Sequence, residues 1–107
     1  MHRSPLRPAL AAALLALAAS PALAQNAQAL HTRALAATCA NCHGTEGRAV
    51  PNANVPGLAG MPALYMIEQL KAFKAGTRPA TVMHQLAKGY SDAQIEALAA
   101  YFAAQKK

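Results

Sequence analysis

Apolar side chains recur at helical spacing in three stretches of the chain, and the first of these runs up to residue 38. Leu30, Ala34 and Leu35 would share one face of a helix there, because residues four and five positions apart lie within about one turn of each other. We expect a helix from about Asn26 to Cys39 with these three side chains facing inward. No stretch shows the alternation of apolar and polar residues that a half-buried strand requires.

A second helix is predicted after a long stretch of helix-breaking residues. Pro62 suits the first turn of a helix, and Gly76 suits its C-terminal stop, so the helix should run from there to about Ala75. Its apolar positions include Ile67, Leu70 and Phe73. The preceding stretch is expected to be a loop because it contains Gly44, Gly47, Pro51, Pro56, Gly57 and Gly60.

The last helix has the clearest start signal. Ser91 is a preferred N-cap residue, and Gln94 three positions later completes the pattern of a capping box. Its apolar stripe should pack against the first helix, which is also rich in alanine. We therefore predict an all-α fold with three main helices. The stripe consists of Ile95, Leu98, Ala99 and Phe102.

The N-terminus has the pattern of a secretory signal peptide. Arg3 and Arg7 precede an apolar run over residues 9–19, and Ala22-Leu23-Ala24 matches the small-residue cleavage pattern. We expect residues 1–24 to be removed on export to the periplasm, with residues 25–107 forming one domain. Retention as a membrane anchor is the alternative, but the apolar run is much shorter than the roughly 20 residues that a spanning helix needs.

Composition limits what the exported part can be. The 83 residues left after cleavage form a small domain, whose core is marginal without a cofactor, a metal or disulfides. Loss of two arginines reduces the ten Lys and Arg to eight, against four Asp and Glu, so the net charge is +4. This modest charge does not indicate nucleic-acid binding. Four cationic residues have two interpretations, either a basic rim that attracts an acidic redox partner or an ordinary solvated surface. They are Lys71, Lys74, Arg78 and Lys88.

The segment Cys39-Ala40-Asn41-Cys42-His43 has the Cys-x-x-Cys-His spacing of a covalent haem c attachment site. On a helical turn both sulfurs lie on one side, where each can bond one vinyl group of haem, and His43 is the expected proximal iron ligand. A thioredoxin-type dithiol is an alternative, but it is expected near a strand-helix-strand pattern. A structural zinc site would need two further ligands, for which only His31 and His84 are plausible in the exported chain.

Two further residues are predicted to complete the haem site. Met83 is our choice for the sixth iron ligand, because it lies in a segment between two helices that can fold over the distal face and because a thioether favours ferrous iron. The adjacent His84 is the main competitor. Pro56 is placed to accept a hydrogen bond from the second ring nitrogen of His43, the alternative being a proline that only shapes the loop. The other candidates considered for the iron are Met61, Met66 and His31.

These motifs, in this order, resemble those of class I cytochromes c, and the resemblance covers the whole exported chain. Val82–Tyr90 is similar to the cytochrome subunit of flavocytochrome c sulfide dehydrogenase, and the chain as a whole is similar to one half of periplasmic two-haem cytochromes. The other matching segments are Cys39–Gly44, Pro56–Gly60, Tyr65–Gly76, Thr81–Met83 and Leu98–Phe102.

The resemblance implies an electron carrier rather than an enzyme, with one haem c bound by Cys39 and Cys42 and ligated by His43 and Met83. A second motif for haem attachment is absent from the sequence, so transfer between two haems of one chain is not expected. The partner would be a redox protein, and pairing with a second copy or with a flavoprotein subunit stays open. A ligand sensor with an open iron position is a third hypothesis, against which Met83 counts.

Overall fold

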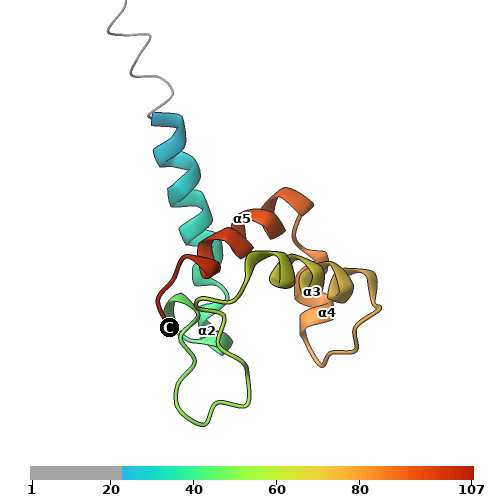
Figure 1. The fold of residues 1–107 in the computed structure, drawn as a ribbon. Helices are drawn as coiled ribbons and strands as arrows, with labels where there is room; N and C mark the ends of the chain where they lie inside the picture. Colours follow the sequence, from blue (N-terminus) through green and yellow to red (C-terminus); the bar gives the residue numbers. More distant parts are fainter. Residues whose placement is uncertain (1–22) are drawn as a thin grey trace, which may run out of the picture. The chain divides into compact units, whose positions relative to one another are not determined.

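The computed structural model describes residues 23–107, and this part of the chain is helical without any strand (Figure 1). Residues 1–22, which hold most of the expected signal peptide, lie outside the described part. The chain divides into two compact units, residues 1–31 and 32–107, and the fold described below is that of the second. None of the helices within residues 23–107 is both long enough and apolar enough to cross a membrane.

The first helix spans residues 23–37, so it begins slightly before the expected Asn26. The predicted inward face is correct at Leu35, which packs against the core, but wrong at Ala34 and at Leu30, which is 69% exposed. Ala36 is buried instead. In a helix this rich in alanine, apolar positions occur on every side. Spacing alone therefore could not identify the face that packs.

A second long helix, α3 (Ala63–Ala75), has the predicted limits. Pro62 is its N-cap residue, and Gly76 ends it in the left-handed conformation with φ of 78°. The amides of Gly76 and Thr77 bond back to the carbonyls of Phe73 and Ala72 at 3.1 and 3.0 Å, which satisfies carbonyls that the helix end would otherwise leave unpaired.

A short helix that the sequence analysis did not predict, α4 (Met83–Lys88), follows α3 and packs against it. We expected this segment to be a connection. Val82, its N-cap residue, makes no side-chain capping bond, and six residues are too few for a recognisable apolar repeat. Its packing against α3, with Ala87 fully buried, is the interaction that stabilises it.

The last helix, α5 (Asp92–Ala103), begins with the predicted capping box. The Ser91 hydroxyl accepts a hydrogen bond from the Gln94 amide at 3.2 Å, and the Ser91 amide donates to Gln94 Oε1 at 2.9 Å. Two amides that a helix start leaves without partners are thereby satisfied. The four apolar positions of the predicted stripe are all buried: Ile95, Leu98, Ala99 and Phe102.

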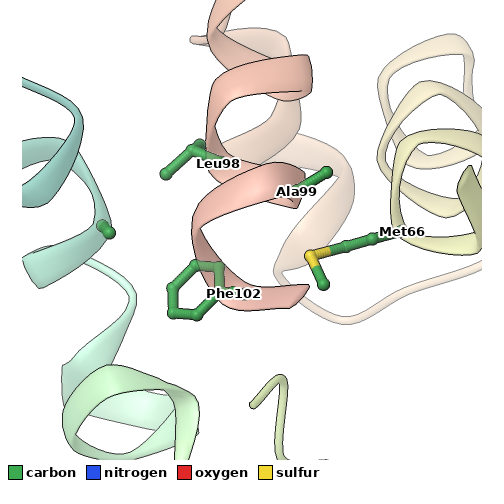
Figure 2. Packing of buried hydrophobic residues seen from close by; sticks show 5 residues of the cluster. Met66, Leu98, Ala99 and Phe102 are labelled. Atoms are coloured by element: carbon green, nitrogen blue, oxygen red, sulfur yellow. The ribbon is translucent and has the colours of Figure 1, made fainter. Parts of the chain in front are cut away.

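The core forms where α5 meets α3 and the end of the first helix. Figure 2 shows Met66 of α3 pointing at α5, toward Ala99 and Phe102. Met66 is 4% exposed, which agrees with its predicted role in packing, and Ala36 contributes from the first helix. The predicted contact between the first and last helices is therefore present, although it uses Ala36. Tyr101 and Phe102 meet edge to face, with their ring centroids 5.2 Å apart.

Candidate haem-attachment site

The two cysteines lie at the junction between the first helix and a second, much shorter one. Thr38 and Cys39 form a turn after residue 37, and α2 (Ala40–His43) follows directly. Both thiols are free, Cys39 being half-buried and Cys42 exposed.

His43 closes α2 and is 7% exposed. Its Nδ1 lies 2.7 Å from the carbonyl oxygen of Pro56. Because a carbonyl can only accept, Nδ1 carries a proton and donates, so in the neutral imidazole Nε2 has the free lone pair. This is how a metal-binding histidine is normally oriented by its surroundings. The structure thus joins His43 and Pro56, the two residues that sequence reasoning had placed on the proximal side.

The loop that presents the Pro56 carbonyl is held at its base by η1 (Thr45–Gly47). The Gly47 carbonyl accepts hydrogen bonds from Leu58 and Ala59 at 2.7 and 3.1 Å. Gly47 has φ of 78°, and a Cβ at this position would lie 2.9 Å from the Ala59 amide and 2.9 Å from the Phe102 ring. Only glycine allows this close approach. The loop is thereby fixed to the core beside α5.

Two hydroxyl groups affect the pKa of the Cys39 thiol, and sequence reasoning identified neither of them. Burial raises the pKa of the Cys39 thiol, while hydrogen bonds with the Thr38 and Tyr90 side chains oppose that rise. The Thr38 and Tyr90 hydroxyl oxygens lie 3.4 Å apart. Thr38 adjoins the motif in sequence, but Tyr90 is 51 positions after Cys39. No local pattern could have placed Tyr90 there.

Met83 and His84 are the first two residues of α4, and both are half-buried. Nδ1 of His84 is buried and has no hydrogen-bond partner among the described residues. The structure therefore places both candidate sixth ligands on one helical turn, packed against α3. Of the other candidates, Met61 and Met66 pack with the core, and His31 is exposed on the first helix.

Two of the four cations considered as a basic rim are used within the fold. Lys74 donates from Nζ to the Tyr90 carbonyl at 2.6 Å and lies 3.4 Å from Asp92 Oδ1. The Arg78 guanidinium stacks 4.6 Å from the centre of the Phe73 ring and also bonds Gln69. Lys71 and Lys88 are exposed. The four residues therefore do not form a continuous rim of free cations.

The donors present fit haem c better than the alternatives. Two free thiols lie three residues apart, and the following imidazole is buried with one nitrogen already occupied by a carbonyl. The strand-helix-strand context of a thioredoxin-type dithiol does not occur within residues 23–107. In the same part of the chain, no three His, Cys, Asp or Glu side chains gather closely enough to hold a metal ion.

Known proteins are similar in sequence to this chain over much of its length. The thiosulfate dehydrogenase electron acceptor of Thiomonas intermedia is 45% identical over 71 residues, which cover 66% of this chain and 33% of that protein. The cytochrome subunit of sulfide dehydrogenase from Chlorobaculum tepidum is 40% identical over 68 residues, covering 64% of this chain and 60% of that protein. The chain thus spans less than two thirds of either relative.

A solved structure and a family profile agree with these relatives. The structure of cytochrome c4 from Acidithiobacillus ferrooxidans matches with a TM-score of 0.57 and 42% identity, over 61% of this chain and 37% of that one. The profile of the family described as cytochrome c matches residues 31–106, which include the whole Cys-x-x-Cys-His motif and all of α3, α4 and α5. The chain belongs to the cytochrome c family.

Proposed function

We propose that this protein is a periplasmic carrier of single electrons with one haem c. Cys39 and Cys42 would hold the haem through thioether bonds, and His43 and Met83 would be its axial ligands. The observation that carries the proposal is the buried His43 imidazole, with Nδ1 bonded to the Pro56 carbonyl and Nε2 left for iron. When bound, the haem supplies a reversible one-electron couple.

The protein's own residues would orient this cofactor and ligate its iron. The Pro56 carbonyl fixes the His43 ring and increases the basicity of Nε2. Met83 would add a neutral, soft sulfur from α4, a ligand type that favours the ferrous state. Transfer of an electron requires no proton donor or nucleophile, so the function needs no residues beyond those that hold the haem.

Periplasmic location is proposed because of the N-terminal pattern that ends at Ala24. Expression of the full chain in a bacterium that attaches haem c in its periplasm tests both parts of the proposal. We expect a soluble red protein that starts at Gln25 and whose mass exceeds that of the polypeptide by one haem. The haem should stay with the chain on a denaturing gel.

A matched pair of variants separates covalent attachment from simple binding. Cys42→Ser should leave one thioether and shift the pyridine haemochrome band, whereas Asn41→Ser, within the same motif, should not. Haem that acid acetone extracts from the unchanged protein would contradict the proposal. Rapid binding of carbon monoxide to the reduced protein would contradict ligation by Met83 and favour a ligand sensor.

The second candidate function is the haem subunit of a flavocytochrome c sulfide dehydrogenase. The similarity to the Chlorobaculum tepidum subunit favours it, as does the segment Val82–Tyr90 noted above. In that case the chain would receive electrons from a flavoprotein. Purification from its natural host should then yield a complex with a yellow, flavin-containing chain. A monomer in native extracts, measured by light scattering, would count against this assignment.

A further inference from the structure

The Arg48 side chain joins the proximal loop to the residues that follow α5. Its Nε donates to the Lys106 carbonyl at 2.9 Å, and its Nη1 donates to Glu46 Oε2 at 2.6 Å. A planar guanidinium group holds two such acceptors in a fixed geometry, which the flexible ammonium group of a lysine does not do. Arg48 therefore fixes η1 on one side and the backbone of Lys106 on the other.

Glu46, the partner of Arg48 within η1, has an unusual backbone conformation. Its φ of 53° lies in the left-handed region, which residues other than glycine adopt at an energetic cost. Both side chains of the ion pair are partly exposed, so the pair adds little to the free energy of unfolding. Its effect is geometric, because it holds the turn of η1 in one arrangement.

A short series of hydrogen bonds leads from this turn to the imidazole. The carbonyl of Gly47, the last residue of η1, accepts from the amides of residues 58 and 59 at 2.7 and 3.1 Å. The same stretch of chain presents the Pro56 carbonyl, which accepts from His43 Nδ1 at 2.7 Å. The turn that the arginine fixes and the carbonyl that orients the imidazole therefore belong to one hydrogen-bonded unit.

We propose that Arg48 is a positioning residue that sets the hydrogen bond between His43 and the Pro56 carbonyl, and through it the reduction potential of the haem. Functional geometry depends on such supporting bonds around the residues that bind. A firmly held carbonyl increases the basicity of Nε2, and a more basic ligand stabilises ferric iron. The inference rests on the proposed function and goes beyond it, because it gives a role to a residue outside the attachment motif.

Loss of the Arg48 side chain has two effects that change the potential in opposite directions. Removal of a positive charge favours the oxidised haem and lowers the potential. Loss of the tether weakens the bond at Nδ1 and makes Nε2 less basic, so it favours ferrous iron and raises the potential. The direction of the shift therefore distinguishes a positioning role from a purely electrostatic one.

The test is the haem-loaded Arg48→Met variant, which keeps a long side chain and removes the donors. We expect its reduction potential to rise above that of the unchanged protein. The Nδ1 proton of His43, observed by NMR in the ferrous protein, should exchange with solvent about tenfold faster, because the bond that protects it opens more often. Arg48→Lys, which keeps the charge and loses the fork, should show both changes to a smaller extent.

Lys107→Met is the matched control. The Lys107 side chain lies beside Gly60, at the other base of the same loop, so the variant removes one positive charge and leaves the bonds of Arg48 in place. We expect a potential that is unchanged or slightly lower, because only the charge effect operates. The exchange rate of the His43 Nδ1 proton should be the same as in the unchanged protein.

A potential that is unchanged or lower in Arg48→Met, or an unchanged exchange rate of the Nδ1 proton, would overturn the proposal. Should Arg48→Met fail to fold, the same two measurements on Arg48→Lys decide, and no change in either is the contrary result. Contrary results in variants that still carry covalent haem would leave the proposed function intact. A full chain without covalent haem would instead contradict the proposed function and this inference with it.

Discussion

At His43 a single hydrogen bond occupies one ring nitrogen and leaves the other without a bond to the Pro56 carbonyl. Nδ1 is occupied by the Pro56 carbonyl at 2.7 Å, and burial of the ring keeps water from competing for that carbonyl. The imidazole is consequently held in one tautomer and one orientation. A backbone carbonyl cannot be removed by changing a side chain. The position of the loop, rather than the identity of residue 56, is thus the property that matters for His43.

The choice between Met83 and His84 as sixth ligand has a spectroscopic test. In Met83→Ala the ferric near-infrared band of sulfur bound to iron should disappear, because the thioether that produces it is gone. In the matched variant His84→Ala the band should remain. Absorption spectra of the two oxidised variants give the answer. Loss of the band in His84→Ala alone would reverse the assignment.

Two glycines with the same backbone conformation provide a test of packing at residue scale. Gly47 and Gly76 both have φ of 78°, but a Cβ on Gly76 meets nothing within 4 Å, whereas one on Gly47 meets the Ala59 amide and the Phe102 ring. Gly76→Ala should cost only the strain of the left-handed conformation, about 1–3 kcal/mol. Gly47→Ala should cost roughly 1–3 kcal/mol more from overpacking. Thermal unfolding of the haem-loaded variants measures the difference, and equal losses would contradict it.

The stability of α5 depends on the hydrogen bonds of its N-terminal cap. Ser91→Ala removes the acceptor for the Gln94 amide, and we expect a loss of about 1 kcal/mol in the free energy of unfolding. Ser91→Asp, which keeps an acceptor at the N-cap, should restore most of the stability. Chemical denaturation of the haem-loaded protein measures both. A full loss in Ser91→Asp would show that the hydroxyl matters for another reason.

One lysine of α3 bonds the chain just before the start of α5. Lys74→Met removes the donor to the Tyr90 carbonyl, so the variant should lose about 1–2 kcal/mol of stability. The ion pair with Asp92 adds little, because the Asp92 side chain is mostly exposed. Lys71→Met, an exposed position on the same helix, is the control and should be neutral within about 0.5 kcal/mol. Equal effects in denaturant titrations would contradict the specific role of Lys74.

The elements that could be predicted are those whose ends carry chemical signals. Pro62 and Gly76 delimit α3, and the Ser91 capping box starts α5, because these residues stabilise helix ends through local bonds. α4 has no such signal, and its stability comes from packing. The contact of Pro56 with His43 was foreseeable because His43 was expected to bind iron, and metal-binding histidines generally need an acceptor. The hydrogen bond between Tyr90 and Thr38, the residue before Cys39, depends on the tertiary fold, so the sequence alone did not reveal it.

At the scale of the whole molecule, the core formed by protein alone is small. Its buried cluster contains two alanines, and the larger side chains come from Met66, Leu98 and Phe102. A domain of this size usually depends on a cofactor or a cross-link for a fixed structure. Haem would supply both additional apolar area and two covalent links to the junction at Cys39 and Cys42.

We therefore expect the protein to lose most of its fixed tertiary structure without haem. Cys39→Ser with Cys42→Ser, produced in the cytoplasm, should show weak near-UV circular dichroism and a broad thermal transition, while the haem-loaded protein unfolds cooperatively. The comparison uses the same buffer for both proteins. A sharp transition in the haem-free protein would contradict this expectation.

The way in which the loop of residues 44–60 is anchored has a consequence for how its length can vary. The Gly60 amide bonds to the Phe102 carbonyl at 2.9 Å, and Arg48 Nε bonds to the Lys106 carbonyl at the same distance. One flank of the loop is thus fixed to the last turn of α5 and the other to the residues that follow α5, while its tip at residues 50–54 is exposed. An inserted residue at the tip can bulge into solvent, but one at either base would pull the Pro56 carbonyl away from the imidazole. Length variation and grafted tags should accordingly be tolerated over residues 50–54, and the two flanks should resist them.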